Sequence, residues 1–438
     1  MLIDEYQDLN RCDLSVISAI RDRGVEIFGA GDDDQSIYGF RYAHPEGIRR
    51  FDEDHTPASS FTLGTCIRCD RKIIDLALFI ANLDPYRLEK PIEPRVGAGD
   101  GEVYLLRFSD QLCEAEGVAH LCKYLIGTEG YSPKDILILM RSDRNGVFSS
   151  LLREYLDAYS VPVAIQVEGT PLDQGDGRIL LSFLRLLVYN GDSLALRTLL
   201  MTRENGIGNE SFSHIYSLAQ NISQNFSNTA HQIIAEPELI PRIGSRISGE
   251  IQEILSIIQA NKDSFEAANS SLDPRNLLIF LRDLANHVIR ENSVKTDVLD
   301  YLGMILQETN ATDFGTLLRA LSSSLENEEQ ELDSDSVNIM TMHKAKGLTS
   351  EAVIVVAAED EYIPGRQTGE KEGDERRLLY VSLSRARHFL AVTYCDYRKG
   401  LQRHTGRTSG QTRRTLTRFL RDAPIRPIDG IRFINSLD

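Results

Sequence analysis

The chain has 438 residues, a length that typical domain sizes divide into about three domains. Apolar residues make up 42% and charged residues 26%, as in ordinary globular proteins. The 48 basic and 65 acidic residues leave a net charge of −17, which argues against binding nucleic acid through bulk charge but allows a locally basic groove. No stretch is apolar enough for a transmembrane helix and no signal peptide is present, so we expect no membrane association. Six cysteines are too few for a disulfide scaffold and indicate a cytoplasmic protein.

The first part of the chain, residues 1–90, alternates short apolar runs with helical patterns. Such strand–helix alternation indicates an α/β fold with a parallel sheet. The segment 93–101 contains prolines and glycines and predicts a linker to a second domain. The predicted elements are a strand at 2–3, a helix capped by Asp13 and running to Ile20, a strand at 25–28 and a helix after Asp70.

The α/β pattern resumes after the linker, is interrupted by a helical region and then returns. From 192 to 335, apolar residues recur at helical spacing with few strand signals, which predicts an all-helical insertion ending in the acidic run Glu326–Asp335 as a solvated loop. We therefore expect one second domain divided into 91–191 and 336–438. The predicted strands are 103–108, 136–140, 337–340, 353–356 and 389–393, and the predicted helices are 114–125, 147–156 and 375–386.

Two adjacent acids, Asp4 and Glu5, follow the first predicted strand. They fall at the carboxyl edge of a parallel sheet, where α/β proteins bind ligands. Asp4 can hold Mg²⁺ there, directly or through water, and Glu5 can orient or deprotonate an attacking water. The alternative is that the two acids are simply exposed to solvent at a strand end. An acidic pair considered on its own favours this alternative.

A second polar segment, residues 31–41, follows the next predicted strand. Gln35 is a candidate polar sensor. The alternation of Tyr38, Phe40 and Arg41 suits stacking on unpaired bases and contact with a phosphate, and the alternative is that both aromatic residues belong to the core. A dinucleotide-binding loop is disfavoured, because the third glycine of that fingerprint is missing and three acids would repel a pyrophosphate.

Two segments late in the chain carry polar groups on a loop and on a helix. Thr341 and His343 begin a lysine-containing loop that suits phosphate contacts, the alternative being a basic turn. Arg385 continues the buried stripe of its predicted helix, four residues after Val381. An arginine at that place can reach a γ-phosphate on a neighbouring domain, and a structural salt bridge is the alternative.

Cys66 and Cys69 form an isolated Cys-x-x-Cys pair. The chain has no second pair of this kind and no paired histidines that would complete a zinc site. We therefore expect two buried or incidental thiols rather than a zinc or redox centre.

Taken together and in order, these segments resemble motifs II to VI of the UvrD/Rep-type superfamily 1 DNA helicases. The resemblance spans residues 2–424 and rests on DEYQD, GDDDQSIYGFRYA, LGTCIRCDRKIIDLA, TMHKAKGL, ERRLLYVSLSRAR and the closing segment TRFL. It implies RecA-like P-loop NTPase motor domains with parallel sheets, the first incomplete at 1–90 and the second interrupted by the helical insertion. It also implies an ATP-dependent 3′–5′ DNA helicase or translocase that uses Mg²⁺ and acts on single-stranded DNA, duplex DNA and their junctions.

The resemblance assigns a role to each candidate residue by its position in a motif. Glu5 would activate water, Gln35 would sense the γ-phosphate, and the two arginines would stabilise the charge on the transferring phosphoryl group. The implied catalytic residues are Glu5, Gln35, Arg68 and Arg385, and the implied metal ligands are Asp4 and Glu5. ATP contacts are implied for Asp4, Glu5, Gln35, Arg68, Gly347 and Arg385, and DNA contacts for Tyr38, Phe40, Arg41, Thr341 and His343.

The largest departure from the family is the missing Walker A loop, since none of the 31 glycines is followed by lysine. Without that loop the phosphates lose a backbone cradle and a lysine, so we expect weak ATP binding and slow turnover by the chain alone. One explanation is an amino-terminally truncated or split helicase, partnered by a separate amino-terminal half that carries Walker A. The alternative is a catalytically inactive helicase-like DNA-binding or interaction protein. A RecB-type nuclease fusion ranks last, because no further carboxylate–lysine cluster follows Ala386.

Smaller departures concern motifs IV and V. The segment Cys66–Cys69 keeps the arginine of motif IV but has two cysteines and an isoleucine where the family usually has Ser, Asn and Tyr. Motif V has Thr349 where a glutamate commonly stands, and whether Glu351 substitutes for it stays open. The arginine-rich tail after Asp396 is equally consistent with contact to a phosphate backbone and with a basic surface that balances acidic helices.

Overall fold

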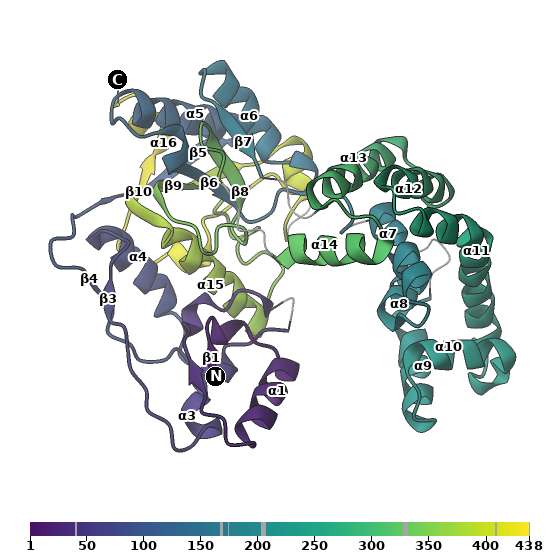
Figure 1. The fold of residues 1–438 in the computed structure, drawn as a ribbon. Helices are drawn as coiled ribbons and strands as arrows, with labels where there is room; N and C mark the ends of the chain where they lie inside the picture. Colours follow the sequence, from purple (N-terminus) through teal and green to yellow (C-terminus); the bar gives the residue numbers. More distant parts are fainter. Residues whose placement is uncertain are drawn as a thin grey trace. The chain divides into compact units, whose positions relative to one another are not determined.

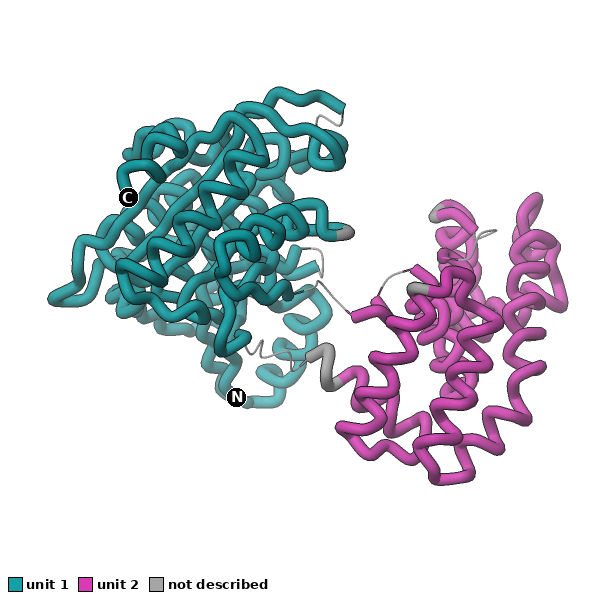
Figure 2. Tube along the Cα trace, turned by 90° about the horizontal axis from the view of Figure 1, so that it is seen from above, with its two compact units in different colours: residues 1–168, 330–438 teal, residues 169–329 magenta. Residues whose placement is uncertain are grey.

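The computed structural model describes residues 1–39, 42–166, 170–173, 175–202, 207–326, 332–407 and 410–437. The chain divides into two compact units: unit 1 comprises residues 1–168 and 330–438, and unit 2 comprises residues 169–329 (Figure 2). Unit 2 begins earlier than the insertion predicted from residue 192, because the helix α7 (Gly175–Val188) packs against the helices that follow it rather than against the sheet.

Unit 1 is built on a seven-stranded sheet, and its parallel pairing confirms the predicted α/β class (Figure 1). Its strands are β5 (Glu102–Asp110), β6 (Ile136–Met140), β7 (Val163–Ile165), β8 (Val337–Thr341), β9 (Ser350–Val355), β10 (Ala386–Tyr397) and β11 (Pro427–Asp429). Their order across the sheet is β11-β5-β10-β9-β6-β8-β7. All five side chains of β6 are buried, as expected for a parallel strand with helices over both faces.

Two groups of helices flank this sheet. One group consists of α5 (Gln111–Gly127), α6 (Ser149–Ala158) and α16 (Gly430–Ile434), and the other consists of α4 (Arg71–Ala81) and α15 (Glu370–Leu383). In Figure 1 the sheet lies between the two groups. Because α4 and α15 come from opposite ends of the sequence and pack together, the early and late parts of the chain share one hydrophobic core.

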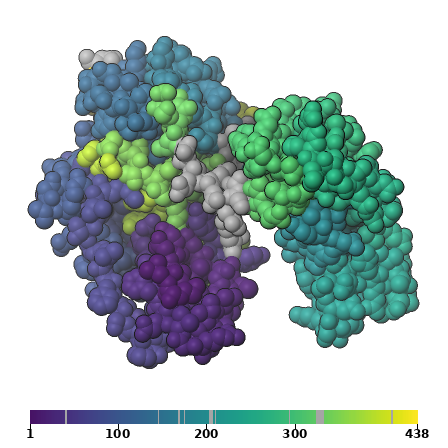
Figure 3. All heavy atoms as spheres, in the orientation of Figure 1, coloured from purple at the N-terminus to yellow at the C-terminus, as the bar shows by residue number. Residues whose placement is uncertain are grey.

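The remainder of unit 1 is formed by short elements from the first 96 residues. Two parallel pairs occur, β1 (Leu2–Ile3) with β2 (Phe28–Gly29) and β3 (Thr65–Cys66) with β4 (Glu93–Pro94). The helices are α1 (Arg11–Arg21), α2 (Glu46–Arg49) and α3 (Phe51–Asp54). Figure 3 shows the purple atoms of this N-terminal segment next to green atoms from the last third of the chain.

Three predictions for the N-terminal segment need correction. The strand predicted at 25–28 is wrong in position, since only Phe28 and Gly29 pair with β1. Asp13 does not cap α1. The side chain of Asn10 accepts from the backbone N–H groups of Cys12 and Asp13, and the Asp13 carboxylate accepts from the N–H of Asn10 in a reciprocal capping box. The predicted linker 93–101 contains β4.

Unit 2 contains only helices among its described residues, and they enclose a core of their own. After α7 come α8 (Ser193–Thr202), α9 (Asn209–Asn221), α10 (Phe226–Ala235), α11 (Gly244–Ser270), α12 (Pro274–Val288), α13 (Asn292–Thr309) and α14 (Phe314–Glu326). Of the predicted acidic loop, residues 327–331 lie outside the described residues. Over the part of the chain that is described, no helix combines the length and apolar character needed to cross a membrane.

Candidate functional site

The acids at the end of β1 lie at the surface of unit 1. Asp4 is exposed, and one of its carboxylate oxygens accepts the backbone N–H of Glu5 at 2.9 Å. Glu5 adopts a left-handed backbone conformation with φ of 51°, and its side chain is 57% exposed. The amide of Gln7 donates to a Glu5 carboxylate oxygen at 2.5 Å and so holds that side chain in place. Two accessible carboxylates of this kind are the hard oxygen ligands that Mg²⁺ prefers.

Gln7 also joins the end of β1 to the segment that carries Gln35. Its side-chain oxygen accepts the N–H of Asp32 at 3.0 Å, and its backbone carbonyl accepts the hydroxyl of Ser36 at 2.9 Å. The amide of Gln35 donates to Asp32 at 2.7 Å. The buried Gln7 therefore fixes the candidate sensor relative to the candidate metal ligands. Sequence reasoning passed over this residue, although it lies within the motif DEYQD.

Lys346 connects the late loop 341–348 to both of these segments. Its ammonium group lies 3.1 Å from a Glu5 carboxylate oxygen, also pairs with Asp8, and donates to the carbonyl of Gln35 at 3.1 Å. It further lies 5.0 Å from the ring centroid of Tyr38, within cation–π range. The side chain is only 8% exposed. The sequence analysis did not single out Lys346, even though it belongs to TMHKAKGL, because its partners are far away in the sequence.

Arg68 and Arg385 meet at a single residue, Ser384. Arg68 donates to the Ser384 carbonyl at 3.3 Å, and Arg385 donates to the Ser384 hydroxyl at 3.0 Å. Arg385 is 2% exposed, which confirms its predicted burial, but it lies in the turn between α15, which ends at Leu383, and β10 rather than on the predicted helix. It also donates to the carbonyls of Val381 and Leu348 at 2.8 and 3.2 Å. Burial and the nearby charge of Arg68 lower the pKa of Arg385 to about 10, while Glu5 acts in the opposite direction. Two guanidinium groups held this close together suit an anionic ligand.

A buried ion-pair network anchors the segment 31–38 to the helices. Lys90 pairs with Asp32, Asp33 and Asp34, so these three neighbouring carboxylates face a cation of the protein. The remaining pairs are Arg49 with Asp33 and Asp84 at 2.9 Å each, Arg87 with Asp34 at 2.7 Å, and Arg376 with Asp84 at 2.6 Å. This network is structural in character, and it joins the N-terminal segment to α15.

The candidate DNA residues are in different surroundings. Tyr38 is partly buried against the main core, next to Lys346. The Thr341 hydroxyl is buried and has no hydrogen-bond partner among the described residues. Burial and the charge of Arg141 lower the pKa of His343 to about 4, which keeps its imidazole neutral near pH 7. Phe40 and Arg41 lie outside the described residues.

The structure also gives the surroundings of two motif V residues and of the arginines in the tail. Gly347 is exposed at φ of 85°, a left-handed conformation that glycine adopts without strain and that turns the loop beyond Lys346. Glu351 is engaged by Arg387 at 2.8 Å and by His388 at 3.2 Å. In the tail, Arg398 and Arg414 are buried, whereas Arg407 and Arg418 keep exposed surface and pair with Asp360.

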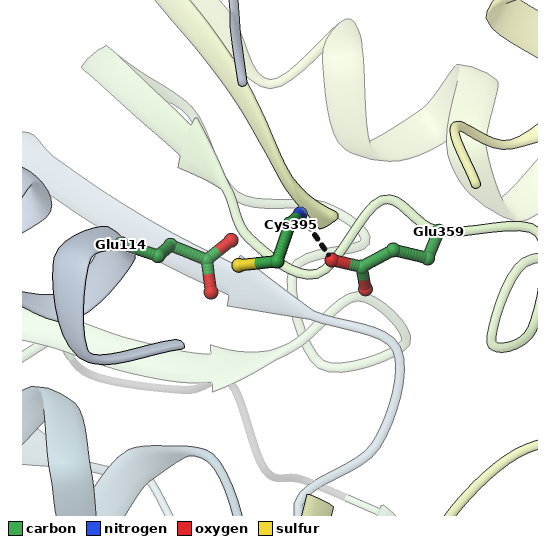
Figure 4. Close-up of side chains that lie close together, drawn as sticks. All are labelled: Glu114, Glu359 and Cys395. Carbon is green, nitrogen blue, oxygen red and sulfur yellow. Dashed lines mark hydrogen bonds between the residues drawn. The ribbon is translucent and has the colours of Figure 1, made fainter. Parts of the chain in front are cut away.

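A second buried polar cluster brings together Glu114, Glu359 and Cys395 (Figure 4). The guanidinium of Arg398 pairs with Glu114 and with Glu359, each at 2.6 Å, and the backbone N–H of Cys395 donates to Glu359 at 2.6 Å. Two guanidinium nitrogens of Arg398 and the N–H of Cys395 all donate to the same oxygen of Glu359, whereas its other oxygen is buried without a hydrogen-bond partner among the described residues. Because a cation of the protein already sits between the carboxylates, the cluster is an ion-pair centre rather than a metal site.

Comparison with known proteins gives a family for this arrangement. Residues 61–397 match the UvrD-like helicase C-terminal domain, and residues 1–56 match the UvrD/REP helicase N-terminal domain. The chain is 25% identical to the ATP-dependent DNA helicase PcrA of Staphylococcus epidermidis, covering 89% of this chain and 54% of that protein. It is 26% identical to DNA helicase II of Escherichia coli strain K12, with 91% and 56% covered, and 28% identical to DNA helicase II of Rickettsia typhi, with 91% and 60% covered.

The chain thus spans little more than half the length of these relatives. The family matches cover both the early segment that carries Asp4 and Glu5 and the late segment that carries Lys346 and Arg385. The two matches occur in the same order as the motifs along the chain. The seven-stranded parallel sheet and the helical unit agree with the RecA-like fold expected from the motifs. The chain belongs to the UvrD/REP-type superfamily 1 helicases.

Proposed function

We propose that this chain forms part of an ATP-dependent DNA helicase or translocase that moves 3′ to 5′ along one DNA strand. The observation that carries the proposal is the convergence of residues from five separated motifs within unit 1. Lys346 joins Glu5 and the backbone of Gln35, and Ser384 joins Arg68 and Arg385. Phosphoryl transfer depends on this kind of assembly, since its catalysis is mainly positioning and charge stabilisation.

Each polar group has a definite task in this proposal. Asp4 and Glu5 hold Mg²⁺, which when bound neutralises phosphate charge, and Glu5 also orients the attacking water. Gln35 contacts the γ-phosphate. Arg68 and Arg385 stabilise the charge that spreads over the transferring phosphoryl group. Gly347 allows the backbone of its loop to approach the nucleotide.

The same unit supplies candidate contacts to single-stranded DNA. Thr341 and His343 stand on the loop that also carries Lys346, and a neutral imidazole can accept or donate a hydrogen bond without adding charge. Tyr38, together with Phe40 and Arg41 beyond the described residues, supplies aromatic surface for base stacking. The candidate DNA contacts lie next to Lys346, which pairs with Glu5, and this proximity provides a direct route for coupling between the two ligands.

We further propose that a polypeptide segment carrying a Walker A loop completes the nucleotide site. The sequence has no glycine followed by lysine, so the chain itself lacks that phosphate-binding lysine. Around β1 to β4, large apolar side chains are exposed, namely Leu2, Phe28, Phe61, Leu63 and Val96. Large apolar side chains that are exposed in this way are candidates for contact with another polypeptide. The same segment has short two-stranded sheets whose edges can accept further strands.

The decisive experiment measures ATP hydrolysis with and without single-stranded DNA. The chain is assayed alone and mixed with a polypeptide that carries a UvrD/REP helicase N-terminal domain including its Walker A loop. We expect little turnover from the chain alone and DNA-stimulated turnover from the mixture, abolished by Glu5→Gln. Robust turnover of the chain alone that also requires Glu5 contradicts the need for a Walker A partner.

The missing Walker A lysine also favours a second candidate function, a helicase-like DNA-binding protein without ATPase activity. The two functions separate in a binding assay with a fluorescent oligonucleotide, read at two salt concentrations because phosphate contacts weaken with salt. Salt-sensitive DNA binding with no ATP hydrolysis in the mixture supports the second candidate. Hydrolysis in the mixture supports the motor.

A further inference from the structure

Two cysteines lie next to the arginine pair of the candidate site. Cys66 ends β3 and is partly exposed, whereas Cys69 is 2% exposed and lies just before α4. The Cys66 sulfur lies 3.5 Å from the backbone nitrogen of Cys69. The Cys69 sulfur lies 3.4 Å from the Ser384 carbonyl oxygen, which is the same oxygen that accepts from Arg68. The two cysteines therefore stand on either side of Arg68 in the sequence. Cys69 also lies next to the Ser384 carbonyl oxygen that accepts the hydrogen bond from Arg68.

We propose that Cys66 and Cys69 form a redox-active dithiol, which a peroxide converts to a disulfide that loosens the contacts of Arg68 and Arg385 with Ser384. The two positions are three residues apart, with a bend between them. The bend brings the Cys66 sulfur to 3.5 Å from the backbone nitrogen of Cys69, and a disulfide requires such a close approach of the two residues. The other four cysteines lie elsewhere, Cys12 on α1, Cys113 and Cys122 on α5 and Cys395 on β10.

The surroundings of the two thiols give them different reactivities. The pKa of Cys66 is lowered to about 5, against the effect of burial. The causes are a hydrogen bond from the Cys69 thiol, hydrogen bonds from the backbone N–H groups of Cys69 and Arg68, and the charge of Arg68. The same hydrogen bond and burial raise the pKa of Cys69. Cys66 is thus an accessible thiolate and Cys69 a buried thiol, which matches the attacking and resolving cysteines of redox-sensitive proteins.

The oxidation balances with hydrogen peroxide as the oxidant. The Cys66 thiolate attacks one peroxide oxygen, so that an S–O bond forms, the O–O bond breaks and hydroxide leaves to become water. Sulfur is oxidised to a sulfenic acid and the peroxide is reduced. The Cys69 sulfur then attacks the Cys66 sulfur, an S–S bond forms, the S–O bond breaks, and the departing hydroxide takes the Cys69 proton. The sum is two thiols and one peroxide giving one disulfide and two waters.

Disulfide formation has a direct effect on the arginine pair. The Cys69 thiol has one proton, which is within reach of both the Cys66 sulfur and the Ser384 carbonyl oxygen, and its departure as water leaves that carbonyl without the thiol as a donor. Arg68 lies within the closed loop and is displaced with it, while Arg385 is held by the hydroxyl of the same serine. The regulatory meaning of this step rests on the proposed function, because both arginines are assigned there to ATP. The disulfide itself does not depend on that assignment.

The chemical test treats the reduced full chain with hydrogen peroxide and analyses a tryptic digest by mass spectrometry. Trypsin cleaves after Arg68, between the two cysteines, so the disulfide appears as two linked peptides. We expect this link in the wild-type chain and in Cys12→Ser, a control that removes an exposed thiol on α1. Cys66→Ser should abolish the link. Cys69→Ser should leave a sulfenic acid on Cys66 that dimedone traps. If peroxide oxidises Cys12 but forms no link between positions 66 and 69, the proposal is overturned.

A kinetic measurement tests whether Cys66 is the attacking thiol. At pH 6, iodoacetamide should modify Cys66 on the order of tenfold faster than an ordinary cysteine, because its larger thiolate fraction outweighs its lower intrinsic nucleophilicity. Peptide mapping gives the rate at Cys12 in the same sample. A rate at Cys66 equal to or below that at Cys12 contradicts the assignment of Cys66 as the attacking thiol.

The coupling to the arginines is tested by hydrogen exchange, without ATP or DNA. On oxidation, the peptide covering 381–387 should exchange about threefold to tenfold faster, the equivalent of one lost hydrogen bond. Cys66→Ser should show no such change. A disulfide that forms without faster exchange overturns the coupling. Because neither readout involves helicase activity, failure of the proposed function would leave both results interpretable.

Discussion

Arg68 donates a hydrogen bond of 3.3 Å to the carbonyl of Ser384, 316 positions later in the sequence. Arg385 follows directly after that serine and contacts its hydroxyl at 3.0 Å. One residue of the late segment therefore positions two guanidinium groups, one from each end of the chain. Any ligand that recruits both arginines must also sense the conformation of the turn after α15.

Replacing Arg385 tests its role in ATP hydrolysis. In the mixture with a Walker A-bearing polypeptide, Arg385→Ala should lower the DNA-stimulated rate by about 10³-fold or more, the range seen when such arginines are absent. Arg385→Lys should also be impaired, because an ammonium group does not reproduce the planar fork of a guanidinium. The matched control is Arg387→Ala, which removes an exposed arginine paired with Glu351. Circular dichroism verifies folding, and a wild-type rate in both Arg385 variants contradicts the assigned role.

Lys90 tests the buried ion-pair network. Lys90→Met leaves Asp32, Asp33 and Asp34 without their shared cation, and removal of one partner from a buried ion pair costs about 3–5 kcal/mol. Chemical denaturation of unit 1 should show a loss of that order. Lys72→Met removes an exposed lysine from α4 and should change the free energy of unfolding by less than about 0.5 kcal/mol. If the two variants lower the free energy of unfolding equally, the buried lysine contributes no more to stability than an exposed one.

The Arg398 cluster predicts a decrease of stability with rising pH. Burial raises the pKa of Glu359 to about 7, against the attraction of Arg398. Since the folded state then binds a proton that the unfolded state has released, this contribution is complete below about pH 4.5 and disappears as the pH rises through about 7. Glu359→Gln, which is always neutral, should melt above wild type at pH 8 and lose the pH dependence.

The control for this prediction is Glu116→Gln, an exposed glutamate on α5, the helix that also carries Glu114. It should follow the wild-type melting profile from pH 4.5 to 8. The measurement is differential scanning fluorimetry across that range. If Glu359→Gln melts below wild type at pH 8 by as much as at pH 5, Glu359 is ionised in the native state and the expected sign is wrong.

His343 predicts the opposite trend in the acidic range. Its folded pKa of about 4 lies below the ordinary value of 6.5, so the unfolded state binds more protons between these values. Stability due to the neutral imidazole is therefore present above about pH 6.5 and is lost as the pH falls toward 4, by on the order of 1–3 kcal/mol. His343→Gln should flatten this part of the stability profile. The same acid-induced loss in His343→Gln and in wild type would assign the effect to other groups.

Sequence patterns predict the fold of unit 1 well where burial is continuous. The apolar run Ile136–Met140 is buried throughout, and the structure has a strand at those bounds. β7 and β11 were missed because each has only three residues and none of their side chains is fully buried, which leaves too little pattern. The strand predicted at 25–28 fails for lack of burial. Its apolar residues are mostly exposed, and only Phe28 pairs with β1.

The candidate site could be predicted in its residue types but not in its pairings. Helical spacing predicted the burial of Arg385 correctly, although the helix ends two residues earlier, at Leu383. The contact of Lys346 with Asp8 joins positions 338 residues apart, and no local period contains that information. The same limit hid the burial of Arg398, because its partners lie on α5 and after β9.

Unit 2 occupies a particular place in the chain: it is the connection between β7 and β8, two adjacent parallel strands that pair from Val163 with Val337 to Ile165 with Ile339. Parallel neighbours always need a crossover, usually a single helix. Here a whole helical unit serves as that crossover, and its outgoing chain leads through β8 into the loop with Thr341, His343 and Lys346. β8 is hydrogen-bonded on both sides, to β6 and to β7. A displacement of the chain where it leaves the helical unit therefore reaches the loop with His343 and Lys346 through a strand that is hydrogen-bonded on both sides.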